Sequence, residues 1–158
     1  ECVNTMVKVA KSVEPTINYW KRFTKKDWKI EEADIESHAA YTTCVTARDI
    51  KADAIIDYTH TGNSATRLSG YGPACPIFAI TDSEKVYNQL GPVWNVYPIL
   101  IKDGADIDDT IEKGVEKLIE LGKLEEGDTA VLCGGPQIMI KEKSKYAVNK
   151  TVGGILKI

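Results

Sequence analysis

The residues best suited to hold a ligand form one short polar run directly after the apolar segment 54–58. At the start of a helix, a run of this kind can bind an anion through its hydroxyl donors, through unpaired backbone N–H groups and through the positive end of the helix dipole. A phosphate monoester fits these donors, although the same residue types also serve as an ordinary helix cap. The spacing matches neither the Walker loop nor GxGxxG. The candidate phosphate-binding residues are Thr59, His60, Thr61, Gly62, Asn63 and Ser64.

Two side chains could in principle act as nucleophiles, His60 and Cys133. A histidine that accepts a phosphoryl group needs a carboxylate to orient its ring, and Asp57 is the nearest one in sequence. A strand followed by a loop does not bring residues three apart together, so we expect His60 to be a donor beside a phosphate. Cys133 ends an apolar segment with no histidine nearby and is expected to fill the core. No residue of the chain is therefore assigned a catalytic role.

A second glycine site follows the apolar segment 129–133 and precedes a lysine-rich stretch. A cationic loop near a helix-start anion site could close over a phosphate, so four residues are effector-loop candidates: Gly134, Gly135, Lys145 and Lys150. The acidic residues 106, 108 and 109 are typical of a helix N-terminus, where the dipole favours them. The 4 cysteines and 2 histidines show no zinc spacing, so we expect neither a metal site nor a cofactor.

Composition narrows the class of partner. The 158 residues with a formal charge of -3 describe one compact domain of ordinary globular composition. Nucleic acids and anionic membrane surfaces favour a basic face, so neither is expected as a partner, and no apolar run is long enough to span a membrane. Scattered cysteines without a disulfide framework favour reduced thiols in the cytoplasm. Small molecules and proteins remain as partners.

The elements that must position the polar run alternate between strands and helices. Apolar runs predict strands near 54–58, 76–80, 96–101, 129–133 and 155–158, and helical spacing predicts helices over 34–50, 64–71, 84–90 and 108–122. This order indicates an α/β fold of three layers, with a mostly parallel five-stranded sheet covered on both faces. In helix 108–122 one face carries Ile111, Val115, Leu118 and Ile119. In helix 34–50 the packing face is expected to carry Ile35, Ala39, Thr42, Val45 and Thr46.

The N-terminal third of the chain has a different pattern. Apolar residues recur at helical spacing over 3–17, with Pro15 expected to kink or end the helix. Residues 21–32 lose this period and are rich in charge, which favours a connecting segment. We therefore expect a boundary between an N-terminal helix and the α/β unit in this stretch.

Four segments in order resemble the C-terminal domain of pyruvate kinase. The opening ECVNTMVKVAKSVE is similar to the last helix of that family's catalytic barrel, and ADAIIDYTHTGNSATRLSGYGPACPIFAIT is similar to its strand, phosphate loop, helix and following strand. QLGPVWNVYPIL resembles its Trp-Gly-Val-Tyr-Pro segment, and LEEGDTAVLCGG its Gly-Asp turn into the penultimate strand. The resemblance covers nearly the whole chain and implies that the last strand of the sheet is antiparallel.

The resemblance implies a domain division and a function. Residues 1–23 would be the remnant of the last barrel helix, 24–33 a linker, and 34–158 the effector-binding domain. The parent enzyme would transfer a phosphoryl group from phosphoenolpyruvate to ADP in glycolysis, using Mg and K in a barrel that this chain lacks. The chain itself would be inactive as a kinase, and its partners would be a phosphorylated effector, the barrel and, in a homotetramer, other subunits. Residues 59–64 would hold the effector phosphate.

Several positions depart from the family pattern. Asn63 stands where many members have arginine, and Asn95 replaces the glycine after Trp94. Thr110 takes the place of an arginine that binds the second phosphate of fructose bisphosphate, and residues 136–151 differ from the usual effector loop. These departures favour a monophosphate, such as AMP or a sugar monophosphate, over fructose bisphosphate. Two other hypotheses stay open, a small phosphotransfer protein that uses His60 and a degenerate domain that serves only subunit assembly.

Overall fold

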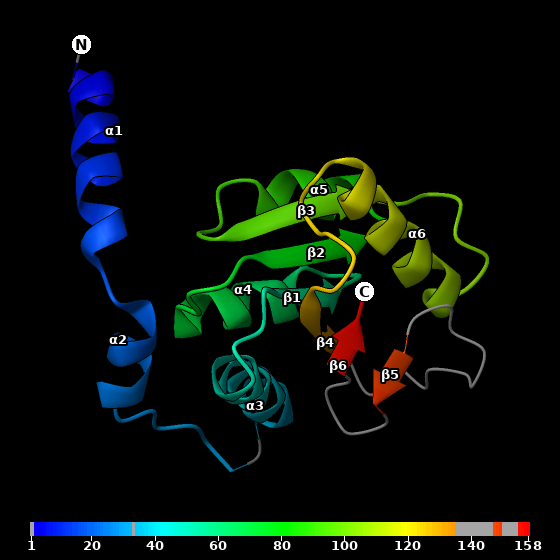
Figure 1. Ribbon diagram of the computed structural model, residues 1–158, viewed down its shortest axis with the longest axis horizontal. Helices are drawn as coiled ribbons and strands as arrows, with labels where there is room; N and C mark the ends of the chain where they lie inside the picture. The colour runs from blue at the N-terminus through cyan, green and yellow to red at the C-terminus, as the bar shows by residue number, and fades with distance from the viewer. Residues whose placement is uncertain (1, 33, 135–146, 150–154) are drawn as a thin grey trace.

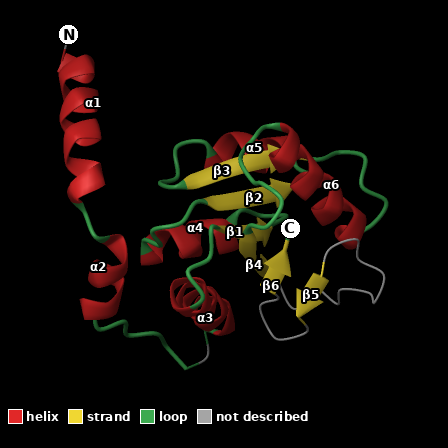
Figure 2. Cartoon of the chain, in the orientation of Figure 1, coloured by secondary structure: helices red, strands yellow, loops and turns green. Residues whose placement is uncertain are grey.

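The computed structural model describes residues 2–32, 34–134, 147–149 and 155–158, and its elements alternate as expected (Figures 1 and 2). None of the helices in these ranges has the length and apolar character needed to span a membrane. The helices are α1 Cys2–Val13, a 3-10 turn Glu14–Thr16, α2 Tyr19–Lys25, α3 Ile35–Asp49, α4 Asn63–Tyr71, α5 Glu84–Leu90 and α6 Ile107–Glu120. The strands are β1 Ala54–Tyr58, β2 Ile77–Thr81, β3 Val96–Leu100, β4 Thr129–Gly134, β5 Ala147–Asn149 and β6 Ile155–Lys157.

The sheet has the order β3-β2-β1-β4-β6-β5. The pairs β3·β2, β2·β1 and β1·β4 are parallel, and β6 pairs antiparallel with both β4 and β5. This confirms the α/β class and the antiparallel last strand. The sheet has 6 strands rather than five because β5 forms within the lysine-rich stretch that the sequence indicated to be a loop.

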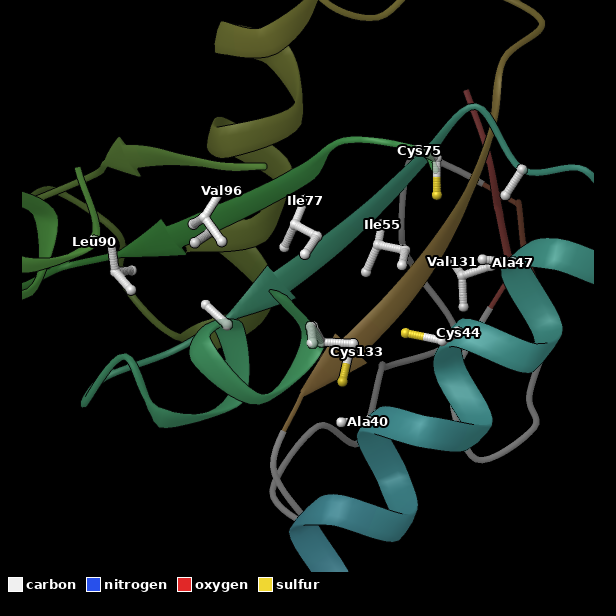
Figure 3. Packing of buried hydrophobic residues seen from close by; sticks show 14 of the residues in the cluster. Ala40, Cys44, Ala47, Ile55, Cys75, Ile77, Leu90, Val96, Val131 and Cys133 are labelled. Atoms are coloured by element: carbon white, nitrogen blue, oxygen red, sulfur yellow. The ribbon is translucent and has the colours of Figure 1, made fainter. Parts of the chain in front are cut away.

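The alternation of side chains along the strands divides the core into two clusters. Ile55, Ile77 and Val131 point to the side covered by α3, α4 and α5, where they meet Cys44, Ala65 and Leu90 (Figure 3). The strand residues between them point to the other side, where α6 supplies the cover. We call these the α3 face and the α6 face. The α6 face is lined by Ile56, Phe78, Ile80, Ile99, Ile111, Val115, Leu118 and Leu132.

Helix α3 packs through a different face from the one expected. Ile35 is 77% exposed, and the buried residues are Ala40, Thr43, Cys44 and Ala47. These side chains are small, so the helix axis can approach the sheet closely, and the Thr43 hydroxyl donates to the Ala39 carbonyl at 2.8 Å. The expected face is wrong because the buried stripe lies about one residue further along the helix, at positions 40, 43, 44 and 47. Asp34 is the N-cap of α3, and its carboxylate accepts from the Ser37 N–H at 3.0 Å.

The N-terminal region contains a helix that the charge pattern concealed. Helix α1 ends at Val13 and the turn containing Pro15 follows, as expected. Residues 21–32 were expected to form a connecting segment, yet α2 covers Tyr19–Lys25, and the Asn18 side chain accepts from the Lys21 N–H at 2.8 Å. Phe23, only 3% exposed, anchors α2 to the α3 face. Every residue of α1 is exposed, and Figure 1 shows this helix projecting from the rest of the chain.

Candidate functional site: the loop between β1 and α4

The polar run 59–64 lies at the carboxyl end of β1 and leads into α4. Thr59 is buried, and its hydroxyl accepts from the Gly62 N–H at 2.9 Å, which closes the loop into a tight turn. Gly62 is the N-cap residue with φ 84, a left-handed conformation that favours glycine. The Thr66 hydroxyl donates to the Gly62 carbonyl at 2.9 Å and fixes the loop to the first turn of the helix. The turn is therefore held by its own side chains.

The first turn of α4 adds unpaired backbone donors to the loop. The amides of Ser64 and Ala65 lie within the first four positions of the helix, where no intrahelical carbonyl is available. The side chains of His60, Thr61 and Asn63 are exposed around these amides. Two of the expected donors are engaged elsewhere, since Thr59 closes the loop and Ser64 donates inward to Asp57. The free donors of the loop are therefore chiefly the backbone amides of the helix start rather than a set of converging hydroxyls.

Asp57 is a buried carboxyl directly beneath the loop. It is fully buried on the α3 face of β1, and its Oδ2 atom accepts from the Ser64 hydroxyl at 2.8 Å. Its Oδ1 atom has no hydrogen-bond partner among the described residues. Desolvation raises the pKa of Asp57 to about 7, although hydrogen bonds from Ser64 and Cys133 act in the opposite direction. The carboxyl therefore changes charge near neutral pH, and it does so in direct hydrogen-bond contact with Ser64, a residue of the loop.

The carboxylate partner of His60 is Asp82. The His60 Nδ1 atom lies 2.9 Å from the Asp82 Oδ1 atom, and the two side chains are 72% and 45% exposed. Asp57, the carboxylate nearest to His60 in sequence, bonds to Ser64 instead. The sequence places each of the two residues two positions after an expected strand, 54–58 and 76–80, but only the strand register shows that they meet. Tyr58 on β1 is in register with Ile80 on β2, so the residues two positions further along each strand meet at the same edge of the sheet.

The second glycine site also begins at this edge. Gly134, the last residue of β4, is in register with Tyr58, one residue before the loop. The other three effector-loop candidates, Gly135, Lys145 and Lys150, lie outside the described residues. The loop and Gly134 thus share the carboxyl edge of adjacent parallel strands, which is where ligands bind in open α/β sheets.

The buried thiols near the loop are poorly placed to act as nucleophiles. Cys133 is buried, and desolvation raises the pKa of its thiol to about 12, which keeps it protonated at neutral pH. Cys44 and Cys75 are also buried free thiols. Across the described ranges, no group of three or more acidic, histidine or cysteine side chains is placed to hold a metal ion.

Two of the departures noted in the sequence have clear structural explanations. Asn95 adopts φ 58, a left-handed conformation, and its side-chain amide donates to the carbonyls of Pro73 at 3.1 Å and Cys75 at 2.8 Å. These bonds hold a conformation that glycine adopts freely. Thr110 is buried, and its hydroxyl donates to the Asp106 carbonyl at 2.7 Å, within its own helix. It therefore offers nothing to a second phosphate.

Comparison with known proteins places this geometry in one family. Residues 37–146 match the family model described as the pyruvate kinase alpha/beta domain. Curated pyruvate kinases from Clostridium acetobutylicum and Thermotoga maritima are 36% and 34% identical to the chain, and each alignment covers 85% of the chain and 28% of the relative. A solved pyruvate kinase from Cryptosporidium parvum superposes with a TM-score of 0.73 at 25% identity, over 85% of this chain and 28% of that one. The chain thus spans less than a third of each of these relatives, and it belongs to the pyruvate kinase family, in which it corresponds to the C-terminal alpha/beta domain.

Proposed function

We propose that the chain is the regulatory and assembly domain of a pyruvate kinase and binds the phosphate of a small effector at residues 59–64. The observation that supports this most directly is the left-handed Gly62 at the start of α4, which opens the first-turn amides at the carboxyl edge of β1. The exposed ring of His60 adds a further N–H donor beside these amides. A monophosphate, such as AMP or a sugar monophosphate, fits better than fructose bisphosphate because Thr110 is buried.

The parent enzyme would carry out the phosphoryl transfer from phosphoenolpyruvate to ADP in a barrel outside this chain. Mg and K would belong to that barrel, and the α/β domain would need no cofactor of its own. The exposed apolar residues of α1 support the barrel as a partner, since Val3 and Met6 are each 70% exposed and Val7 is 45% exposed. On this proposal residues 1–23 are the end of the last barrel helix, of which the exposed α1 packs against the barrel while Phe23 packs on the α3 face. Residues 24–33 connect, and 34–158 bind the effector and contact other subunits of a homotetramer.

Thermal unfolding of the chain with four phosphorylated compounds tests the proposal. AMP, ribose 5-phosphate, glucose 6-phosphate and fructose bisphosphate would be added at millimolar concentration. A ligand at a hundredfold excess over its Kd stabilises a protein by about 2.7 kcal/mol, which corresponds to a rise in Tm of roughly 5–10 °C. We expect a rise of this kind with at least one monophosphate. An unchanged Tm with all four would instead favour a domain that serves only assembly.

A matched pair of glycine variants locates the binding. Gly62→Ala and Gly122→Ala both place a side chain on a left-handed residue, with φ 84 and φ 62, so both lose backbone stability. Only Gly62 lies at the anion-binding helix start. We expect Gly122→Ala to keep the ligand-induced rise in Tm and Gly62→Ala to lose it. Equal rises in both variants would place the phosphate elsewhere.

The His60–Asp82 pair supports a second candidate, phosphotransfer through histidine. A carboxylate at Nδ1 orients the ring and leaves Nε2 to attack a phosphoryl group. In such a step the phosphorus of phosphoenolpyruvate would bond to Nε2, and the enolate of pyruvate would leave and take up a proton. Phosphorus NMR after incubation with phosphoenolpyruvate distinguishes the candidates. A phosphohistidine signal that disappears in His60→Ala would replace the binding function by this one.

A further inference from the structure

A second concave site lies at the other end of α4 from the phosphate loop. It is a half-open cavity of about 320 Å³ between α2 and the residues that end α4. A helix of 9 residues separates the two sites by about 13 Å along its axis. The cavity is within the size range of small-molecule sites. Its side chains of interest are Tyr19, Arg22, Lys26, Trp28, Tyr71 and Trp94.

The walls of the cavity are aromatic. The rings of Tyr19 and Trp94 lie 4.9 Å apart between centroids, and those of Trp28 and Tyr71 lie 4.8 Å apart. These two pairs join α2 and the segment after it to the end of α4 and to the segment before β3. Indole and phenol rings offer flat apolar surfaces on which a planar ligand can stack. The aromatic walls therefore favour a ligand that contains a flat ring.

The charges at the cavity have a single sign. Its described lining contains the two cations Arg22 and Lys26 and no carboxylate. The Lys26 Nζ atom lies 3.9 Å from the centre of the Trp28 ring. Within the described part of the chain, neither cation forms an ion pair with an acidic side chain. A planar guanidinium and an ammonium without acidic partners favour an anionic group on the ligand.

The cavity is built by the fold rather than by mobile surface side chains alone. Phe23 is buried and packs against Trp28 and Tyr41, which ties α2 and the following segment to α3. The Trp28 indole N–H donates to the Phe23 carbonyl at 3.0 Å, and the Tyr71 hydroxyl donates to the Ser37 carbonyl at 3.1 Å. The polar ends of both rings are thus fixed inside the protein. Their orientation is set before any ligand arrives.

From these observations we infer that the cavity between α2 and α4 binds a small planar aromatic anion, a ring that carries a phosphate or a carboxylate. The ring would stack against Trp28 or Trp94, and the anionic group would meet Arg22 and Lys26. This site differs from the loop 59–64 in requiring a ring as well as a charge. It does not depend on the proposed phosphate site, so either site can exist without the other.

Tryptophan fluorescence of the chain tests the inference, since 2 of its 3 tryptophans, Trp28 and Trp94, line the cavity. AMP and benzoate serve as aromatic anions that carry phosphate and carboxylate, respectively. Adenosine supplies a ring without the charge, and ribose 5-phosphate supplies the charge without a ring. The titrations are repeated with ribose 5-phosphate at saturation, so that the loop 59–64 is occupied. We expect saturable quenching by AMP, benzoate or both, at least tenfold weaker binding of adenosine, and no competition by ribose 5-phosphate.

Charge variants on one helix provide the matched control. Arg22→Gln, Lys26→Gln and Lys25→Gln each remove one exposed cation from α2 or its end, and Lys25 lies outside the cavity. We expect the first two to weaken binding of the anion at least fivefold, and Lys25→Gln to leave it within twofold of wild type. Circular dichroism should show all three variants folded. Absence of quenching by both anions, equal affinity for adenosine, or equal loss in Lys25→Gln would each overturn the inference.

Discussion

The two faces of the sheet differ in what they bury. The α6 face is closed by aliphatic and aromatic side chains, with Val115 and Leu118 fully buried at its centre. The α3 face contains small residues, three buried thiols and the carboxyl of Asp57, and the loop 59–64 lies at its edge. Only the second face combines a polar group in the core with a loop that could bind an anion. Both sides of the sheet therefore bury apolar side chains, but only the α3 face combines this packing with the candidate site.

The largest effect that tests this comparison is expected on the α6 face. Val115→Asp would place a carboxylate at a position with 0% exposure and no compensating partner. Burial of an unpaired charge costs several kcal/mol, comparable with the whole stability of a domain, so we expect the variant to be unfolded. Urea unfolding followed by circular dichroism measures this. Ile119→Asp, at a position 37% exposed on the same helix, is the control and should stay folded.

The next effect, on the α3 face, depends on pH. Because the pKa of Asp57 is raised to about 7 from 3.8 in the unfolded chain, folding favours the protonated carboxyl. Its contribution to stability is complete below pH 4 and is lost as the pH rises through 7, with a total change of roughly 4 kcal/mol. Asp57→Asn keeps an acceptor for Ser64 and removes the titration. We expect the variant to match wild type near pH 4 and to be more stable above pH 7.

The free energy of unfolding from urea titrations at several pH values checks the effect of Asp57→Asn. Asp49→Asn serves as the control, because this carboxylate is exposed and pairs only with Arg48 at the surface. A stability difference between Asp57→Asn and wild type that does not change from pH 4 to pH 8 would contradict an ionisable carboxyl in the core.

The smallest effect compares a glycine on each side of the sheet. At Gly114 on α6 an added Cβ would collide with Ile80, whose Cγ1 would lie 2.8 Å away, whereas at Gly70 on α4 nothing lies within 4 Å. We expect Gly114→Ala to cost about 1–3 kcal/mol through overpacking. Gly70→Ala should instead add up to about 0.5 kcal/mol, because alanine is the better helix former. Urea unfolding of both variants would show opposite signs; a cost at both positions would mean that α4 packs as tightly as α6.

Prediction from the sequence succeeded where the hydrophobic period or the residue types of one segment determined its structure. The buried face of α6 was predicted apart from Ile119, which is 37% exposed, and the position of the polar loop follows from local residue patterns. It failed where tertiary contacts decided. The charged segment around Phe23 becomes helical because one buried ring ties it to α3, and α3 turns its small side chains inward because the sheet lies close. The pairing of His60 with Asp82 needed the register of two strands 22 residues apart.

The three buried thiols also allow transient opening of the α3 face to be measured by the rate of thiol labelling. Cys44, Cys75 and Cys133 lie inside, whereas Cys2 lies on the exposed α1 helix. A maleimide should therefore modify one sulfur at once and the other three only when the layer of helices α3 to α5 transiently separates from the sheet. The opposite side of the sheet carries no sulfur in its described core, so the slow labelling rates would report breathing of one half of this domain alone.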